Sequence, residues 1–203
     1  MNHLRYSGLT FAEQKAHMIK IVRGDPLLMK AFTFAQTMNL PDWYIVSGAI
    51  YNSIWNYLTG RPSGYGLKDI DLFYFEADDL SYEAEDKHIQ LGTRVFAELS
   101  IPVEIRNQAR VHLWFKDHFG FDYPELDCSR DGIDHFASKT HAVGMRLLED
   151  DSFEIYAPFG LDDIFSFKIT PNPVLDNSKT HATKGKRALE FWPQVQVEPW
   201  PTM

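Results

Sequence analysis

The chain has 203 residues, of which 44% are hydrophobic and 14% aromatic, so it can bury a substantial core in one large domain. Its net charge of -8 argues against a partner such as an extended nucleic-acid duplex, because that binding draws on clusters of Lys and Arg. The single Cys128 allows no internal disulfide, and we see neither a leader peptide nor an apolar run that could span a membrane, so we expect a cytoplasmic protein.

The first part of the chain predicts two helices over residues 10–38, divided at Gly24-Asp25-Pro26, whose apolar stripes would cover a sheet. A short strand over residues 43–46 follows and ends at Ser47-Gly48. Next come a helix that Gly60 would stop and a strand over residues 67–75. These elements predict a strand, glycine turn, helix, loop and strand in succession.

Two acids lie one residue apart in that second strand. Because side chains on a strand alternate faces, Asp69 and Asp71 would share one face, with Cα atoms roughly 6.6 Å apart. Gly48 precedes a helix N-terminus, where backbone N–H groups and the helix dipole favour a phosphate. We therefore expect a divalent metal held against a nucleoside triphosphate.

A third carboxylate is expected from the strand over residues 101–106, where Glu104 and Arg106 share a face. Glu104 would ligate one ion and accept the nucleophile's proton, although it could also be a residue of a solvated face. Two ions about 3.5 to 4 Å apart can hold both reacting oxygens of a phosphoryl displacement. Oxygen ligands without nearby Cys or His favour Mg²⁺ or Mn²⁺ over zinc. Arg106 would bind phosphate or clamp a carboxylate.

The flanking elements complete the sheet and its cover. A helix over residues 81–99 begins with acids that we interpret as solvated caps, and a helix over residues 107–118 carries Arg110 as a candidate anion ligand. Residues 140–157 predict a hairpin that extends the sheet.

The last helix, over residues 178–191, places Lys184 and Arg187 on one side. They are the best source of positive charge for a triphosphate in this part of the chain. An ordinary solvated face explains them equally well.

The motifs resemble those of a known superfamily. Three segments look like the head motif of DNA polymerase beta-type nucleotidyltransferases, and their sequences are close to those of CCA-adding enzymes. The segments are Ser47-Gly48-Ala49-Ile50, Leu58-Thr59-Gly60-Arg61-Pro62 and Lys68-Asp69-Ile70-Asp71-Leu72. Nearly the whole chain resembles a bacterial nucleotidyltransferase-like family with no assigned reaction; this match includes residues 103–114, 156–163 and 171–173.

The resemblance implies an α/β (α+β) nucleotidyltransferase-like fold: a mixed sheet with covering helices and a C-terminal helical portion. We expect one domain over residues 1–203, with N-terminal helices in 1–40, the catalytic sheet in 41–160 and a helical appendage in 161–203. It also implies metal ligands at Asp69, Asp71 and Glu104. The NTP-binding residues would be Ser47, Gly48, Lys68, Arg106, Lys184 and Arg187.

The departures limit what the resemblance implies. Ser47-Gly48 replaces the usual Gly-Gly or Gly-Ser, and Tyr51-Asn52 stands where CCA-adding enzymes have Arg-Asp. Their base-selecting motif and long helical tail have no match, so transfer to tRNA ends is not favoured.

We predict a metal-dependent nucleotidyltransferase that moves a nucleoside monophosphate from an NTP to an acceptor hydroxyl and releases pyrophosphate. The acceptor would be a small molecule, a protein or a short RNA end, and no membrane partner is expected. One alternative is an inactive nucleotide-binding or protein-interaction module, such as a regulator or a toxin-antitoxin partner. Another is a metal-dependent phosphohydrolase, which would release orthophosphate.

Overall fold

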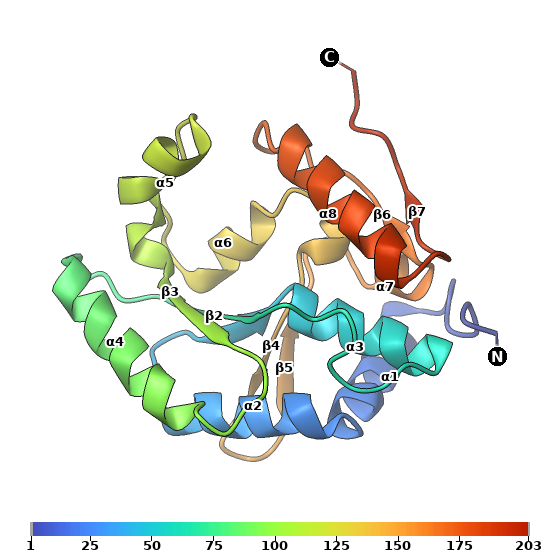
Figure 1. Cartoon of the computed structure of the whole chain (residues 1–203), viewed down its shortest axis with the longest axis horizontal. Coiled ribbons are helices and arrows are strands. Elements are labelled where there is room, and N and C mark those ends of the chain that lie inside the picture. Colours follow the sequence, from blue (N-terminus) through green and yellow to red (C-terminus); the bar gives the residue numbers. More distant parts are fainter. Residues whose placement is uncertain (1, 203) are drawn as a thin grey trace.

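A five-stranded mixed sheet forms the centre of the computed structural model, which describes residues 2–202 (Figure 1). Its strand order is β3-β2-β1-β4-β5. The pairs β1–β2, β1–β4 and β4–β5 are antiparallel, and β2–β3 is parallel. The strands are β1 (Tyr44–Val46), β2 (Ile70–Tyr74), β3 (Val103–Asn107), β4 (Gly144–Leu147) and β5 (Phe153–Tyr156). The predicted α/β fold and the predicted hairpin over residues 140–157 are therefore confirmed.

One face of the sheet carries the main hydrophobic core. Ile45, Leu72 and Ile105 come from three adjacent strands, are at most 3% exposed and belong to the same buried cluster. Alternation along each strand sends these residues to one side and leaves polar residues on the other. The core is covered by α1 (Phe11–Arg23), α2 (Pro26–Thr37), α3 (Gly48–Thr59) and α4 (Tyr82–Val95).

A buried aspartate fixes the loop that leads into β2. Asp25 is the N-cap of α2, and its Oδ1 accepts hydrogen bonds from the backbone N–H groups of Leu27 and Leu28. The same carboxylate accepts hydrogen bonds from the hydroxyls of Ser53, at 2.9 Å, and Ser63, at 2.5 Å. The turn predicted at Gly24-Asp25-Pro26 thus also anchors the loop after α3.

The opposite face of the sheet lies between α5 (Val111–Phe119) and α8 (Ser178–Phe191), with α6 (Ser129–Asp134) between them (Figure 1). Ile133 of α6 packs against Tyr44 and Val46 in a small second cluster. The N-terminal helices and these three helices therefore lie on opposite sides of the sheet.

A buried serine–histidine pair holds α8 in place. Ser138 Oγ lies 2.7 Å from His181 Nδ1, and His181 Nε2 lies 2.8 Å from the carbonyl oxygen of Glu198. Because that carbonyl can only accept, Nε2 carries the proton and Nδ1 accepts the Ser138 hydroxyl. The contact ties α8 to the C-terminal segment.

The remaining elements complete this side. They are the 3-10 helices Gln108–Arg110 and Lys139–His141, α7 (Asp162–Phe165), and a two-stranded sheet of β6 (Lys168–Ile169) and β7 (Gln196–Val197). The segment Pro171-Asn172-Pro173 packs into the fold, since Asn172 is 4% exposed and donates to the carbonyl oxygens of Asp134 and Phe136. Within residues 2–202 no helix has the length and apolar character needed to cross a bilayer.

Two local expectations differ from the structure. The strand predicted over residues 67–75 begins at Ile70, because residues 63–66 form turns and Leu67 N–H donates to Gly64 O instead of pairing with a strand. Asp69 therefore precedes the strand, while Asp71 is within it. The acids that begin α4 were expected to be solvated, but Glu85 is only 4% exposed and pairs with Arg110. Arg110 is thus engaged within the fold.

Candidate active site

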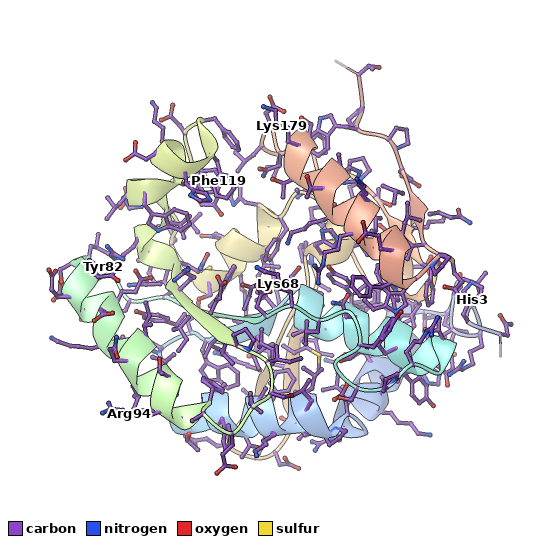
Figure 2. The ribbon with its side chains drawn as sticks, in the orientation of Figure 1. His3, Lys68, Tyr82, Arg94, Phe119 and Lys179 are labelled. Carbon is purple, nitrogen blue, oxygen red and sulfur yellow. The ribbon has the colours of Figure 1, made fainter. Side chains whose placement is uncertain are left out.

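A cavity of about 440 Å³ opens on the polar side of the sheet, and we call it the acid cavity. It lies where β2 and β3 meet the N-terminus of α3 and the inner side of α8. Lys68, which lines it, is labelled near the middle of the view in Figure 2. Both aspartates and Glu104 line it. The other lining residues are Gly48, Tyr51, Asn52, Gly66, Leu67, Lys68, Phe119, Lys184, Arg187, Ala188 and Trp192.

Strand register brings the acids together. Asp71 on β2 is directly opposite Glu104 on the parallel strand β3, so both side chains point to the same face. Asp69 Oδ2 lies 2.8 Å from Lys68 Nζ, and Glu104 Oε2 lies 3.4 Å from Arg106 Nη2. Each of these two acids therefore has a cation beside it.

The electrostatics of Asp71 reflect this crowding. Burial raises the pKa of Asp71 to about 6. The positive charges of Lys184 and Arg106 oppose the shift, and the negative charges of Asp69 and Glu104 add to it. A cation that binds beside Asp71 would therefore stabilise the charged form of its carboxylate.

The turn before α3 keeps a glycine-like backbone although its first residue is serine. Ser47 has φ 53° and ψ -115°, a conformation that residues with a Cβ rarely adopt. Its side chain makes no capping hydrogen bond to α3, and its Oγ is buried without a partner in the described residues. A Cβ at Gly48 would come within 3.9 Å of Tyr51 Oη and Leu67, so the absent side chain keeps this part of the acid cavity open.

We predict that Ser47→Gly stabilises the protein. Relief of the strained backbone is worth about 1–3 kcal/mol, and the greater freedom of glycine in the unfolded chain offsets about 0.5–1 kcal/mol. The expected net gain is about 1 kcal/mol in urea unfolding. Ser47→Ala keeps the strain and removes only the unpartnered hydroxyl, so a gain in Ser47→Ala equal to that in Ser47→Gly would contradict a backbone origin.

The predicted NTP-binding cations do not all line the same cavity. Lys184 and Arg187 of α8 line the acid cavity, and Arg187 Nη2 donates to the carbonyl oxygen of Gly66 at 3.0 Å. Lys68 lines it as well. Arg106 instead lines two neighbouring cavities, and in the strand register it is opposite Phe73 and not opposite either aspartate.

Some lining residues were not among those predicted from the sequence. Tyr51 and Asn52 face the cavity three and four positions after Gly48, so helical spacing from that glycine could have found them. Asn52 Oδ1 is buried without a partner in the described part of the chain. Burial and the charge of Asp71 raise the pKa of Tyr51, so it stays a neutral hydroxyl.

Comparison with known proteins identifies a family for this chain. Residues 33–197 match the model of a nucleotidyltransferase family. The chain belongs to this nucleotidyltransferase family. Among solved structures, one similar protein has an NMR structure described as revealing a CCA-adding enzyme head domain. It is 27% identical in sequence with a TM-score of 0.73, and the match covers 90% of this chain and 95% of that chain. The curated proteins gave no match.

Members of this nucleotidyltransferase superfamily generally use divalent metals, and the acids of the acid cavity have the chemistry to bind one. Asp69, Asp71 and Glu104 offer the oxygen ligands that Mg²⁺ and Mn²⁺ prefer. In residues 2–202 no three acidic, His or Cys side chains are grouped tightly enough to hold an ion as they stand. The chemistry of the set therefore fits, and binding requires the side chains to move closer together.

Proposed function

We propose that the chain transfers a nucleoside monophosphate from an NTP to an acceptor hydroxyl and releases pyrophosphate. The observation that carries this proposal is the acid cavity, in which three carboxylates lie with a helix N-terminus and the cations of α8. Acids that bind metal and positive groups that bind phosphate are both needed for such a transfer.

We infer that Asp69, Asp71 and Glu104 hold Mg²⁺ or Mn²⁺, which would neutralise charge that develops on the phosphate oxygens. The N–H groups of Gly48 and Ala49 at the start of α3 would bind phosphate oxygens, because the Ser47 side chain does not cap them. The N–H of Ser47 itself donates to the carbonyl oxygen of Val143 at 2.8 Å.

Lys68, Lys184 and Arg187 would bind the remaining phosphate charge. The side chain of Lys68 is 70% exposed and can release Asp69 at small cost, since exposed ion pairs contribute about 0–1 kcal/mol.

The remaining step is the attack of the acceptor. Its hydroxyl oxygen forms the new bond to the α-phosphorus, and the bond from that phosphorus to the bridging oxygen of pyrophosphate breaks. Glu104 is the base we assign to the hydroxyl proton, because it lines both the acid cavity and one of the two cavities that Arg106 lines.

One observation favours an enzyme over an inactive module that kept only the fold. Ser47 holds a costly backbone conformation at the entry to α3, and a module without phosphate chemistry has no need of that strain. The strained turn therefore supports retained phosphate binding, and product release separates an enzyme from an inactive nucleotide-binding module.

The test measures binding and product separately. We expect calorimetry to detect NTP binding in the presence of Mg²⁺ and weaker binding with EDTA, because the ion offsets the charge of the three acids. Incubation with Mg²⁺, an NTP and candidate hydroxyl acceptors should release pyrophosphate. Orthophosphate as the first product would indicate hydrolysis instead, and no magnesium-dependent binding of any NTP would contradict the proposal.

A further inference from the structure

A second cavity of about 240 Å³ lies between α5, α6 and α8, and we call it the aromatic cavity. Its walls are mostly apolar. Six aromatic rings contribute to them: Phe73, Trp114, Phe115, Phe119, Tyr123 and Phe136. A cavity of about 150 Å³ lined by apolar side chains can hold benzene, so this one is large enough for a substituted ring.

The rings present flat faces from different elements. Phe73 of β2 stacks on Phe136 with centroids 5.7 Å apart and planes 14° from parallel. Phe115 of α5 packs against Tyr123 with centroids 4.3 Å apart. A planar ring entering the cavity would pack among these rings, and aromatic contacts of this kind are worth more than their buried area alone.

Two cations mark the boundary of the aromatic cavity. Lys184 Nζ lies 5.7 Å from the centroid of the Phe136 ring, and Arg106 extends from β3 with its side chain 43% exposed. No Asp or Glu is among the residues that line this cavity in the described part of the chain. The charge pattern therefore favours an anionic group on the bound ring.

The aromatic cavity adjoins the acid cavity. Phe119 and Lys184 line both, and Figure 2 shows Phe119 on the side of α5 that faces α8. Arg106 also lies two residues from Glu104 on the same face of β3. A ring in the aromatic cavity with a substituent beside Arg106 would thus have that substituent next to Glu104, which lines the acid cavity and lies 3.4 Å from Arg106.

We propose that the aromatic cavity binds the acceptor, a small molecule that carries a planar aromatic ring and an anionic group and presents a hydroxyl to Glu104. The inference rests on the proposed nucleotidyl transfer and names the class of its second substrate. It assigns Arg106 to the acceptor, in place of the triphosphate role predicted from the sequence.

The acid cavity can take the base of the NTP. The acid cavity includes the apolar side chains Leu67, Ala188 and Trp192 beside the phosphate-binding groups, and it is nearly twice as large as the aromatic cavity. The acid cavity therefore offers the base an apolar wall beside the phosphate-binding groups, which leaves the aromatic cavity for the other substrate.

Two tryptophans allow the cavities to be observed separately. Trp114 lines the aromatic cavity and Trp192 lines the acid cavity. In protein labelled with 5-fluorotryptophan, the ¹⁹F NMR signal that disappears in Trp114→Phe belongs to Trp114, and the signal that disappears in Trp192→Phe belongs to Trp192. Phenyl phosphate is the probe for the aromatic cavity, inorganic phosphate is its anion control, and a non-hydrolysable NTP analogue with Mg²⁺ reports on the acid cavity.

We expect phenyl phosphate at about millimolar concentration to shift the Trp114 signal and inorganic phosphate to leave it unchanged. Thr180→Phe, which places a ring in the wall of the aromatic cavity, should weaken binding of phenyl phosphate by about tenfold or more. The matched control is Thr183→Phe, because Thr183 is exposed on the same helix and does not line the cavity. The nucleotide analogue should bind together with the probe.

Three results would overturn the acceptor assignment: an unchanged Trp114 signal, equal probe binding in the two threonine variants, or competition between phenyl phosphate and the nucleotide analogue. Failure of the proposed function has a different signature. A Trp192 signal that ignores the nucleotide and Mg²⁺ would refute nucleotidyl transfer, and the acceptor role with it, even where Trp114 still responds to phenyl phosphate.

Discussion

Asp71→Asn should abolish metal-dependent turnover and at the same time make the protein more stable. Loss of one proposed metal ligand removes several kcal/mol of charge stabilisation in the transition state, so turnover should fall by at least about a thousandfold. The stability gain follows from the desolvated charge of Asp71, whose pKa burial raises to about 6. Pyrophosphate release and urea unfolding measure the two effects.

The sign of the stability change depends on pH. Because the folded protein raises the pKa of Asp71 from 3.8 to about 6, folding becomes less favourable as pH rises through this window. Asparagine removes that penalty, so the variant should be more stable by roughly 1–3 kcal/mol above about pH 6 and equal to the wild type below about pH 4. A variant that is less stable at pH 7 would refute the buried-charge argument.

Asp78→Asn is the matched control for this variant. Asp78 is exposed in the segment after β2, so its replacement removes the same formal charge from the same part of the chain. Turnover and stability should both stay close to those of the wild type, because surface substitutions of this kind change stability within about 0.5 kcal/mol. Equal loss of turnover in both variants would point to net charge and not to a ligand.

Arg110→Met should destabilise the protein by about 3–5 kcal/mol, since it leaves the carboxylate of Glu85 buried without its cation. Glu85 also accepts a hydrogen bond from Asn107 N–H at 2.8 Å, at the end of β3. Arg110 Nε donates to the carbonyl oxygen of Leu80 at 2.8 Å. The pair therefore ties α4 to the strand that carries Glu104.

A double variant separates lost pairing from lost packing. Glu85→Gln combined with Arg110→Met removes both charges, and it should be less destabilised than Arg110→Met alone in urea unfolding. Glu83→Gln, an exposed neighbour on α4, should have little effect. If the double variant equals the sum of the single variants, the two side chains do not interact energetically and the predicted coupling is wrong.

The sequence predicted well those features that are encoded locally. The alternation in β4 and β5, the end of α3 at Gly60 and the apolar stripes of α1 and α2 each depend on residues close together in the chain. The same holds for Asp71 and Glu104, because strand alternation alone fixes their faces once the two strands pair. Their roles as metal ligands stay predictions.

Features set by long-range packing were beyond the sequence pattern. Glu85 looks like a solvated acid at the start of a helix, and only the approach of Arg110 buries it. No element was predicted between residues 118 and 140, where α6 lies, so the aromatic cavity between α5, α6 and α8 could not be foreseen. Lys184 and Arg187 line the acid cavity, whereas Arg106 lines a neighbouring one. This difference likewise depends on how three elements meet.

The pairing of Asp71 with Glu104 also restricts which insertions and deletions the chain can tolerate. Neighbouring residues of β3 point to opposite faces of the sheet. A one-residue deletion inside this strand would therefore turn Glu104 toward the core and Ile105 toward the polar face, which buries an acid and exposes a core residue. A length change in the connection between α4 and β3 leaves that order intact. Natural variation in length should therefore accumulate in the connection and spare the strand.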